Sequence, residues 1–365
     1  MFICNIKTWN FRAFKHLFYS FSPGINIICG DNATGKTSII ESIYVLCLTK
    51  SHRSKKDAEM IKFDSDYLVV KGDFQFNIKK AVLQLSISNK GKLAKLNGKE
   101  SKNLSNYIGY ANVVLFCPED LMIIKGSPSD RRKFIDVEMG QISQLYLKDL
   151  IEYKELIKQR NALLKDIQND RNNKSLFSVL DVIDEKIVET GSKIISSRQK
   201  FIELITEISS KNMHAISSNV ESLKIEYIPT TLQSEYKTNL LNYRETDIMK
   251  GSTSIGPHRD DILIKINDLD VSLFGSQGQQ RSVVLSLKLS LVELISRFKK
   301  EMPILLLDDV FSELDDKRQN EIMKLINKGI QTFITTTSIG EIDKNIIANA
   351  KIFNLNKDKG VEHER

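Results

Sequence analysis

The fold is decided by the stretch Gly30-Asp31-Asn32-Ala33-Thr34-Gly35-Lys36-Thr37-Ser38. It matches the pattern G-x-x-x-x-G-K-[ST], whose glycines let consecutive backbone N–H groups wrap a chain of phosphates. The apolar residues 25–29 precede it, and residues 38–46 carry apolar side chains at helical spacing. A strand, a glycine-rich turn and a helix therefore follow one another, which is the context that a phosphate-binding loop (P-loop) requires.

The P-loop predicts a site for ATP and Mg²⁺. We expect Lys36 to neutralise the β- and γ-phosphates and to serve catalysis, and the Thr37 hydroxyl to ligate Mg²⁺, because this hard cation combines protein and phosphate oxygens. An ordinary glycine turn is the structural alternative, but the pattern and its context make it a poor one. The loop residues that we expect to contact ATP are Gly30, Asp31, Asn32, Ala33, Thr34, Gly35, Lys36, Thr37 and Ser38.

Residues 303–309 supply a second half of the site. They form an apolar run that ends in two carboxylates, Asp308 and Asp309, which predicts a buried strand. We expect this strand to lie beside the P-loop strand. Asp308 would then hold Mg²⁺, and Asp309 would be the general base that orients the attacking water.

Small and polar residues, 275–281, precede a long amphipathic helix that starts near Val283. A helix N-terminus binds anions, although the same residues also suit a plain helix cap. The Ser-Gln-Gly-Gln-Gln segment resembles the signature of ATP-binding-cassette (ABC) proteins. That resemblance implies that Ser276, with Gly278 and Gln279, acts in trans on a nucleotide held by the opposite subunit. Similarly, residues 312–315, which include Ser312 and Asp315, resemble the D-loop along the same dimer seam.

Between the two halves of the site the residue pattern changes twice, first to a strand-like and then to a helical one. Residues 67–97 hold short β-type runs around turns at 89–91 and 97–98, so we expect an antiparallel β layer. Residues 119–225 carry two apolar stripes at heptad-like spacing, which predicts a hairpin of two long helices with a shared core rather than a partner-binding zipper. The stripes comprise Tyr146, Leu150, Tyr153, Ile157, Leu164 and Ile167, then Leu180, Ile183, Ile187, Ile194, Phe201, Ile205 and Ile208.

Composition limits the partners. The chain has 53 basic and 46 acidic residues, a net charge of +7, which permits a polyanionic partner but does not demand one. The four cysteines show no metal-ligand spacing, so we interpret them as buried thiols. There is no leader-like start and no apolar run long enough to span a membrane, so we expect a cytoplasmic protein.

Six segments together resemble the bacterial RecF family, relatives of the SMC heads, over nearly the whole chain. They are residues 10–12, 51–53, 116–121, 127–136, 256–261 and 275–281. The resemblance implies an ATP-dependent dimer that binds single-stranded and gapped or junction DNA in repair and replication. It also implies cooperation with RecR and RecO in loading RecA, and a link to the SOS response.

The expected architecture is α/β: an ABC/SMC-type P-loop ATPase head, with a mixed sheet and an antiparallel β layer, and an inserted helical lobe. Residues 1–118 would form the N-terminal half of the ATPase lobe, and residues 251–365 its C-terminal half. Residues 119–250 would form the helical lobe and offer a surface to DNA, a partner or the second subunit.

Two departures from ABC ATPases bear on turnover. Asp309 stands where they usually place a longer Glu, and the strand at 332–337 ends without their switch histidine. We therefore expect a weak DNA-linked ATPase that uses ATP mainly as a switch for dimerisation.

The basic residues of these segments are candidates for DNA or interface contact, namely Arg53, Arg131, Arg132, Lys133 and Arg259. Cations at 131–133 follow a helix start, where they oppose the helix dipole, so a phosphate contact suits them better than a solvated face. Residues 258–261 suit a salt-bridge cluster or an interface equally. Residues 51–53 suit contact with nucleotide or with DNA.

The rival function is an ABC-type ATPase subunit that energises a membrane transporter. It needs a surface for membrane-domain coupling helices, whereas this chain has a helical insert and RecF-like segments outside the nucleotide site. A structural chromosome protein is a third possibility, but its head would flank hundreds of residues of coiled coil. We therefore favour an ATP-switched DNA-binding protein.

Overall fold

A five-stranded sheet carries the P-loop at the end of β3 (Ile25–Cys29). The computed structural model describes residues 1–218, 220–311, 315–326, 328–342 and 344–356. All four strand pairings are parallel, in the order β14-β3-β13-β12-β8. Most of these strands are buried on both faces, which explains their continuous apolar runs. The other strands are β8 (Val113–Phe116), β12 (Ile304–Leu307), β13 (Thr332–Thr336) and β14 (Ala350–Asn354).

The strand order corrects one expectation. The strand that ends in Asp308 and Asp309 was expected beside the P-loop strand, but β13 lies between β12 and β3. β13 pairs with β3 through Thr332–Thr336 and with β12 through Thr332–Ile334. The carboxyl ends of the three parallel strands meet at one edge of the sheet, so the two halves of the site still converge.

A six-stranded antiparallel sheet confirms the expected β layer. Its order is β2-β1-β4-β5-β6-β7, and the burial of β4 and β5 alternates strictly, as one covered face requires. Asn97 and Gly98 form the turn between β6 and β7, both with positive φ. The strands are β1 (Phe2–Phe11), β2 (Phe14–Ser20), β4 (Tyr67–Gln75), β5 (Lys80–Ser88), β6 (Gly91–Leu96) and β7 (Lys99–Glu100).

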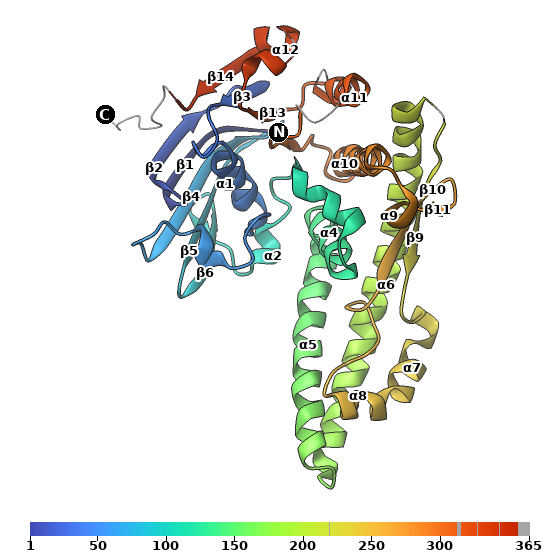
Figure 1. The fold of residues 1–365 in the computed structure, drawn as a ribbon. Coiled ribbons are helices and arrows are strands. Elements are labelled where there is room, and N and C mark those ends of the chain that lie inside the picture. The colour runs from blue at the N-terminus through green and yellow to red at the C-terminus, as the bar shows by residue number, and fades with distance from the viewer. Residues whose placement is uncertain (219, 312–314, 327, 343, 357–365) are drawn as a thin grey trace. The chain divides into compact units, whose positions relative to one another are not determined.

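Helix α1 (Lys36–Leu48) joins the two sheets. It packs against β1, β4 and β5 of the antiparallel sheet and against β13 and β8 of the parallel one (Figure 1). Ten of its thirteen residues are buried, so it is apolar nearly all round rather than amphipathic. The P-loop thus leads directly into the centre of a hydrophobic core.

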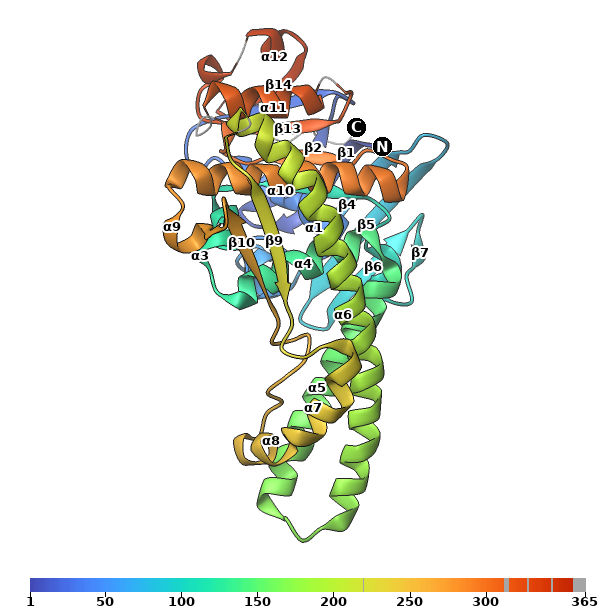
Figure 2. The same cartoon turned by 90° about the vertical axis from the view of Figure 1, so that its right-hand side faces the viewer.

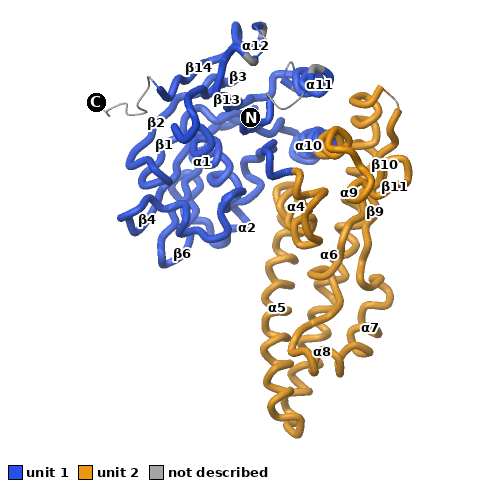
Figure 3. Tube along the Cα trace, viewed as in Figure 1, with its two compact units in different colours: residues 1–120, 285–365 blue, residues 121–284 orange. Residues whose placement is uncertain are grey.

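The chain divides into two compact units (Figure 3). Met1–Asp120 and Leu285–Arg365 form the first, which holds both sheets and α1, and Leu121–Val284 forms the second. The first unit also contains η1 (Asp57–Met60), α2 (Leu104–Tyr107), η2 (Pro118–Leu121, ending at the boundary), α11 (Asp316–Ile326), η5 (Ile339–Glu341) and α12 (Lys344–Ala348). Helix α10 (Gln277–Lys299) begins in the second unit and continues in the first.

The second unit is built on a helical hairpin. Helices α5 (Gln144–Asn169) and α6 (Lys174–Ser217) pack along their length, and α6 alone has 44 residues. The stripe residues are buried, with Ile183 partly buried, and Leu164, Ile167 and Leu180 belong to one hydrophobic cluster that the two helices share. The remaining helices of this unit are α3 (Met122–Lys125), α4 (Pro128–Ile142), η3 (Gln233–Glu235), α7 (Tyr236–Asn242), α8 (Arg244–Lys250) and α9 (Val271–Phe274).

A small antiparallel sheet places residues 251–284 in the second unit. β10 (Asp261–Ile266) pairs with β9 (Leu223–Ile228) and with β11 (Leu269–Asp270). Figure 2 shows β9 and β10 side by side along α6, which β9 contacts. The transition between units therefore falls after Val284 and not, as expected from the sequence, after residue 250.

A buried arginine ties α8 to the hairpin. Arg160 is fully buried and donates to Asp184 through Nε and to Asp247 through Nη1, both at 2.6 Å. Its Nη1 also donates to Thr253 Oγ1 at 2.9 Å. A buried charge is costly unless it is paired and hydrogen-bonded. The contacts of Arg160 therefore fix how α5, α6 and α8 pack together.

The cysteines are all free thiols; Cys29, Cys47 and Cys117 are buried, and Cys4 is half-buried. Burial raises the pKa of Cys47 to about 12, which keeps it protonated and unreactive. Among the described helices, none is both long and apolar enough to cross a membrane.

Candidate functional site: a P-loop with paired carboxylates

The P-loop encloses its own lysine. Lys36 is 4% exposed, and its Nζ donates to the carbonyl oxygens of Gly30 at 2.8 Å and Asp31 at 3.0 Å. Thr34 closes the loop by donating its hydroxyl to the Asp31 carbonyl at 2.8 Å. The ammonium is thus held at the N-terminus of α1, where backbone N–H groups and the helix dipole favour a phosphate.

Gly35 combines a left-handed backbone with a crowded position, so it tolerates no side chain. Its φ is +100°, and a Cβ added there would lie 2.5 Å from the ring of Phe14. At the other end of the loop, the backbone N–H of Asp31 donates to Asn356 Oδ1 at 3.1 Å. Neither Phe14 nor Asn356 was among the expected site residues, because both lie outside the motif.

Asp308 joins the two halves of the site. Its Oδ1 accepts the hydroxyl of Thr37 at 3.1 Å and that of Thr335, on β13, at 2.8 Å. The Thr335 oxygen in turn accepts the backbone N–H of Asp309 at 2.8 Å. Asp309 has a left-handed backbone with φ +53°, a conformation that Asp adopts more readily than most residues.

The electrostatics of Asp308 fit a cation site. Burial raises the pKa of its carboxyl to about 6, and the neighbouring charge of Asp309 adds to the rise. Hydrogen bonds from Thr335 and Thr37 and the positive charge of Arg53 oppose it. A hydroxyl and a buried carboxylate side by side are hard oxygen ligands of the kind that Mg²⁺ takes together with phosphate oxygens, so the residues present fit this ion.

A buried ion pair braces α1 behind the P-loop. Glu41 is fully buried and accepts a bidentate pair from Arg12, whose Nε lies 2.8 Å from Oε2, and a hydrogen bond from Ser51. Burial acts to raise the pKa of Glu41, but the hydrogen bonds from Arg12 and Ser51 outweigh it and hold the pKa below its usual value. The segments at 10–12 and 51–53 are therefore both attached to the P-loop helix.

Within the second of these segments, Arg53 and His52 differ. Arg53 is exposed and its charge acts on Asp308, which places it on the nucleotide side of this unit. His52 lies edge-on to Tyr44, and neither of its ring nitrogens has a hydrogen-bond partner among the described residues. Burial lowers the pKa of His52 to about 4, so the ring is neutral.

The signature segment belongs to the second unit and caps α10. Ser276 and Gln279 form a reciprocal pair: Ser276 N–H donates to Gln279 Oε1 at 2.8 Å, and Gln279 N–H donates to Ser276 Oγ at 3.2 Å. Ser276 is exposed, and Gly278 is half-buried. The structure thus contains the helix cap that was the alternative interpretation, and it also presents Ser276 to solvent at a helix N-terminus.

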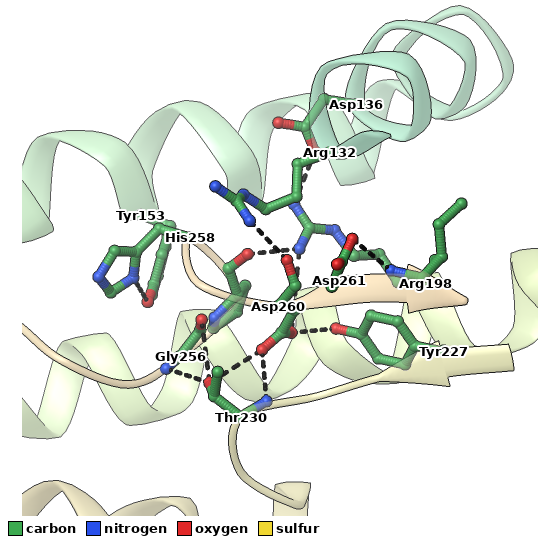
Figure 4. Close-up of polar contacts among 12 residues, drawn as sticks. Arg132, Asp136, Tyr153, Arg198, Tyr227, Thr230, Gly256, His258, Asp260 and Asp261 are labelled. Atoms are coloured by element: carbon green, nitrogen blue, oxygen red, sulfur yellow. Dashed lines mark hydrogen bonds and ion pairs between the residues drawn. The ribbon is translucent and has the colours of Figure 1, made fainter. Parts of the chain in front are cut away.

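Two of the predicted DNA-contact residues, Arg131 and Arg132, make polar contacts inside the second unit. Figure 4 shows Arg132 in this polar network. Arg131 forms a bidentate pair with Asp261, at 2.7 and 2.8 Å, and donates to the Gly126 carbonyl at 2.8 Å. Arg132 donates to the Asp260 carbonyl at 2.6 Å. Both guanidinium groups therefore serve intramolecular contacts, which leave them less available to a phosphate.

Asp260 is a centre of that network. It is fully buried and accepts hydrogen bonds from the Tyr227 hydroxyl and from Thr230 N–H at 2.8 Å. Nearby, Arg198 pairs with Asp136 at 2.7 Å and donates to the Pro257 carbonyl at 2.6 Å. The network joins α4, α6 and the start of β10, and Asp260 and Asp261 take part in it as the salt-bridge cluster that was one of the two interpretations of residues 258–261.

His258 has a structural role. Its Nδ1 lies 2.9 Å from the Tyr153 hydroxyl, which is bonded to the Tyr236 hydroxyl, also at 2.9 Å, and its Nε2 lies 3.2 Å from the Thr253 carbonyl. A carbonyl only accepts, so Nε2 carries the proton and Nδ1 accepts from Tyr153. Burial lowers the pKa of His258 to about 4, in keeping with a neutral ring.

The remaining candidates are surface residues. Lys133 and Arg259 are exposed, and Arg259 Nε donates to the Thr253 carbonyl at 3.2 Å. Asp315 is exposed and pairs with Arg318 at the start of α11. Ser312 lies outside the described residues.

Comparisons with known proteins agree with this geometry. The family model described as the RecF/RecN/SMC N terminal domain matches residues 2–359. The DNA replication and repair protein RecF of Bacillus mycoides (strain KBAB4) is 44% identical over 97% of both chains, and the RecF of Bacillus thuringiensis (strain Al Hakam) gives the same values.

Solved structures give the same result. A structure of the recombination mediator protein RecF with ATP has a TM-score of 0.87 and 35% identity, covering 94% of this chain and 93% of that one. An Smc head domain from Pyrococcus furiosus, 19% identical, has a TM-score of 0.51 over 97% of this chain and 93% of its own, and so shares the fold. The predicted class of ABC/SMC-type head is confirmed, and the chain belongs to the RecF family.

Proposed function

We propose that this chain is an ATP-switched DNA-binding protein of recombinational DNA repair and replication. The observation that carries the proposal is the contact between Thr37 and Asp308, which joins the P-loop to the paired carboxylates across β13. Membership of the RecF family supports it, since relatives are named for DNA replication and repair, and one solved relative holds ATP.

The P-loop residues would bind the nucleotide. Phosphate oxygens are stronger acceptors for Lys36 than the carbonyls of Gly30 and Asp31 that it now contacts, so ATP draws the ammonium onto its β- and γ-phosphates. Thr37 and Asp308 would hold Mg²⁺, which neutralises the developing phosphate charge when bound. Thr335 keeps the Asp308 carboxylate in place through its hydrogen bond.

Asp309 would act on the attacking water. Its carboxylate follows Asp308 on the same strand end, and its backbone is fixed by Thr335. A general base must reach the water by hydrogen bonding, and Asp is one methylene shorter than the Glu of ABC ATPases. We therefore propose that hydrolysis is slow and that it serves to release the ATP-bound state of the protein.

The bound state would be a dimer. Ser276, exposed at the N-terminus of α10 with Gln279 beside it, would contact the γ-phosphate of ATP held by a second copy, because a helix N-terminus favours an anion. ATP bound between two chains stabilises the dimer by its own binding energy. Gly278 allows close approach of the backbone at this position.

DNA and the other repair proteins are the proposed partners. The dimer would bind single-stranded and gapped or junction DNA in the cytoplasm, assist RecA loading with RecR and RecO, and connect to the SOS response. Exposed Arg53, Lys133 and Arg259 are the proposed contacts to DNA or to the second subunit, with Asp315 and Ser312 on the dimer seam. Arg131 and Arg132 would contribute only if contacts to DNA replace their present contacts to Asp261 and to the Asp260 carbonyl.

Light scattering and fluorescence anisotropy test the proposal together. The protein is measured with and without ATP and Mg²⁺, and with labelled gapped DNA at low salt, where phosphate contacts are strongest. We expect the mass to double with ATP and DNA retention to increase with it. A protein that stays monomeric with ATP, or that ignores DNA at low salt, contradicts the proposal; a membrane-transporter subunit would dimerise without retaining DNA.

A further inference from the structure

The outer face of the antiparallel sheet in the first unit has an unusual composition. Strand register places alternate residues of five strands in rows across the sheet. One row, of which the three inner members are at most 2% exposed, faces α1 and comprises Leu17, Thr8, Val70, Leu85 and Ala94. The rows on either side of it point the opposite way, and all their members are half-buried or exposed.

Those two rows define the outer face. The first comprises His16, Trp9, Val69, Ser86 and Leu93, and the second comprises Phe18, Lys7, Lys71, Gln84 and Lys95. Helix α2 does not lie on this side, because its Tyr107 hydroxyl bonds to the Leu46 carbonyl of α1 at 2.7 Å. The face therefore combines aromatic rings with lysines on an antiparallel sheet.

The lysines form a line across the strands. Lys7 and Lys71 are directly opposite each other on β1 and β4, and Lys95 lies two strands further, so the line extends over about 15 Å at ordinary strand spacing. Like charges directly opposite in a sheet destabilise it. A polyanion laid along the line would bring negative charge to all three lysines and would replace Glu100, whose carboxylate lies 3.8 Å from Lys95 Nζ.

Aromatic rings accompany the line. Lys7 Nζ lies 5.0 Å from the centre of the Phe18 ring, and Trp9 stands two residues further along β1 on the same face. Flat sheets with exposed aromatic rings and basic side chains bind single strands, because unpaired bases stack on the rings while the cations contact phosphates. A duplex keeps its bases stacked inside the helix, so it would contact the lysines through its phosphates but would not stack on the rings.

We propose that this outer face is a contact surface for single-stranded DNA, with Lys7, Lys71 and Lys95 on the phosphates and Trp9 and Phe18 under the bases. The inference rests on the proposed function in that it takes DNA as the partner. It adds the surface that receives the single strand, which neither the nucleotide motifs nor the family comparisons assign.

Trp9 makes the test direct, because it is the only tryptophan in the sequence. The full chain is titrated at low salt with unlabelled oligothymidylate while its tryptophan emission is recorded, and with labelled oligothymidylate while anisotropy is recorded. We expect saturable quenching of the emission that parallels the anisotropy and is reversed by salt, since a stacked base quenches the indole and salt competes for the phosphate contacts.

Variants separate this surface from others. Lys71→Glu should weaken binding of the oligonucleotide about tenfold, and Trp9→Ala by a similar factor in the anisotropy assay. Lys200→Glu, the same charge change at an exposed position of α6 in the other unit, should bind as the wild type does. Circular dichroism of each variant confirms that the sheet is retained.

Four outcomes would overturn the inference. If the oligonucleotide binds without changing Trp9 emission and Lys71→Glu binds normally, single strands bind elsewhere, and the proposed function stands without this surface. If Trp9 emission changes with ATP and protein concentration in the absence of DNA, the face contacts a second copy instead. If gapped duplex is retained but no single strand binds, the strandedness is wrong; if no DNA binds at all, the proposed function fails as well.

Discussion

Thr335 and Asp308 are joined by a hydrogen bond of 2.8 Å from the threonine hydroxyl to Oδ1 of the carboxylate. The same hydroxyl oxygen accepts the backbone N–H of Asp309 at 2.8 Å. One side chain on β13 therefore positions both acidic residues of the nucleotide site. This is the structural consequence of β13 lying between β3 and β12.

Thr335→Val should weaken Mg²⁺-dependent ATP binding roughly tenfold, because it removes the donor to Asp308 and leaves the Asp309 N–H unsatisfied while preserving side-chain volume. Titration with a fluorescent ATP analogue, with Mg²⁺ and with EDTA, measures it. Thr335→Ser should bind nearly normally. Thr332→Val removes a buried hydroxyl from the same strand that, among the described residues, donates to the Ile330 carbonyl and not to either carboxylate, so it is the matched control. Equal effects of the two valines would contradict the assignment.

Asp309→Asn should trap a nucleotide-bound dimer, because it removes the proposed base and leaves Asp308 in place. Asn tolerates a left-handed backbone as Asp does, so the φ of +53° is not disturbed. Light scattering over time after addition of ATP measures the lifetime of the dimer. In contrast, Asp308→Asn should weaken formation of the dimer itself. Normal ATP turnover in Asp309→Asn would show that another residue is the general base.

Gly35→Ala should abolish nucleotide binding while the protein stays folded. The added methyl group meets the Phe14 ring at 2.5 Å in a backbone with φ +100°, so the P-loop must shift. Gly98→Ala is the matched control, because its φ is +78° but nothing lies within 4 Å of the added group. It should cost about 1 kcal/mol of stability and leave ATP binding unchanged. Equal ATP affinity in both variants would contradict this account.

The pattern of neighbouring residues was sufficient to predict three parts of the fold. The P-loop is read from nine consecutive residues, the β layer from alternation and turn residues, and the helical hairpin from its stripes. Strand order is different, because β12 and β13 are both short buried strands and nothing local says which one lies next to β3. The expected neighbour was therefore wrong, and Thr335 was missed with it.

Polar contacts between residues far apart in the sequence could not be predicted from the pattern of neighbouring residues either. Arg160 falls on the apolar stripe of α5 between Ile157 and Leu164, which was a usable sign of a buried charge, but its partners Asp184 and Asp247 are 24 and 87 residues away. Likewise, Arg131 was a candidate for DNA or interface contact, and its partner Asp261 lies 130 residues away in the sequence. Sequence identifies such charged residues more readily than it identifies what they contact.

Arg160→Met should destabilise the helical unit by about 3–5 kcal/mol, because it leaves the fully buried Asp247 without its cation. Urea unfolding followed by circular dichroism measures the change. Lys193→Met removes an exposed pair with Glu189 on α6 and should change stability little. Nucleotide binding by the P-loop should be retained in both variants. A small effect of Arg160→Met would mean that the cluster is not needed for packing of α8.

Acidification should destabilise the protein through His258 and His52. Burial lowers the pKa of each to about 4, below the value of about 6.5 in the unfolded chain. The unfolded state therefore binds more protons, so the stabilisation is complete above about pH 6.5 and is lost as the pH falls toward 4. Each histidine would contribute a loss of about 2 kcal/mol by pH 5. Urea unfolding at pH 7 and pH 5 measures the net change, which includes an opposing gain from Asp308, because its raised pKa of about 6 makes the folded state bind a proton in this range. His258→Asn should reduce this pH dependence by about half, since the second buried histidine remains, whereas the same change at exposed His16 should leave it intact. A pH dependence unaltered by His258→Asn would show that the ring is charged, or solvated, in the folded protein.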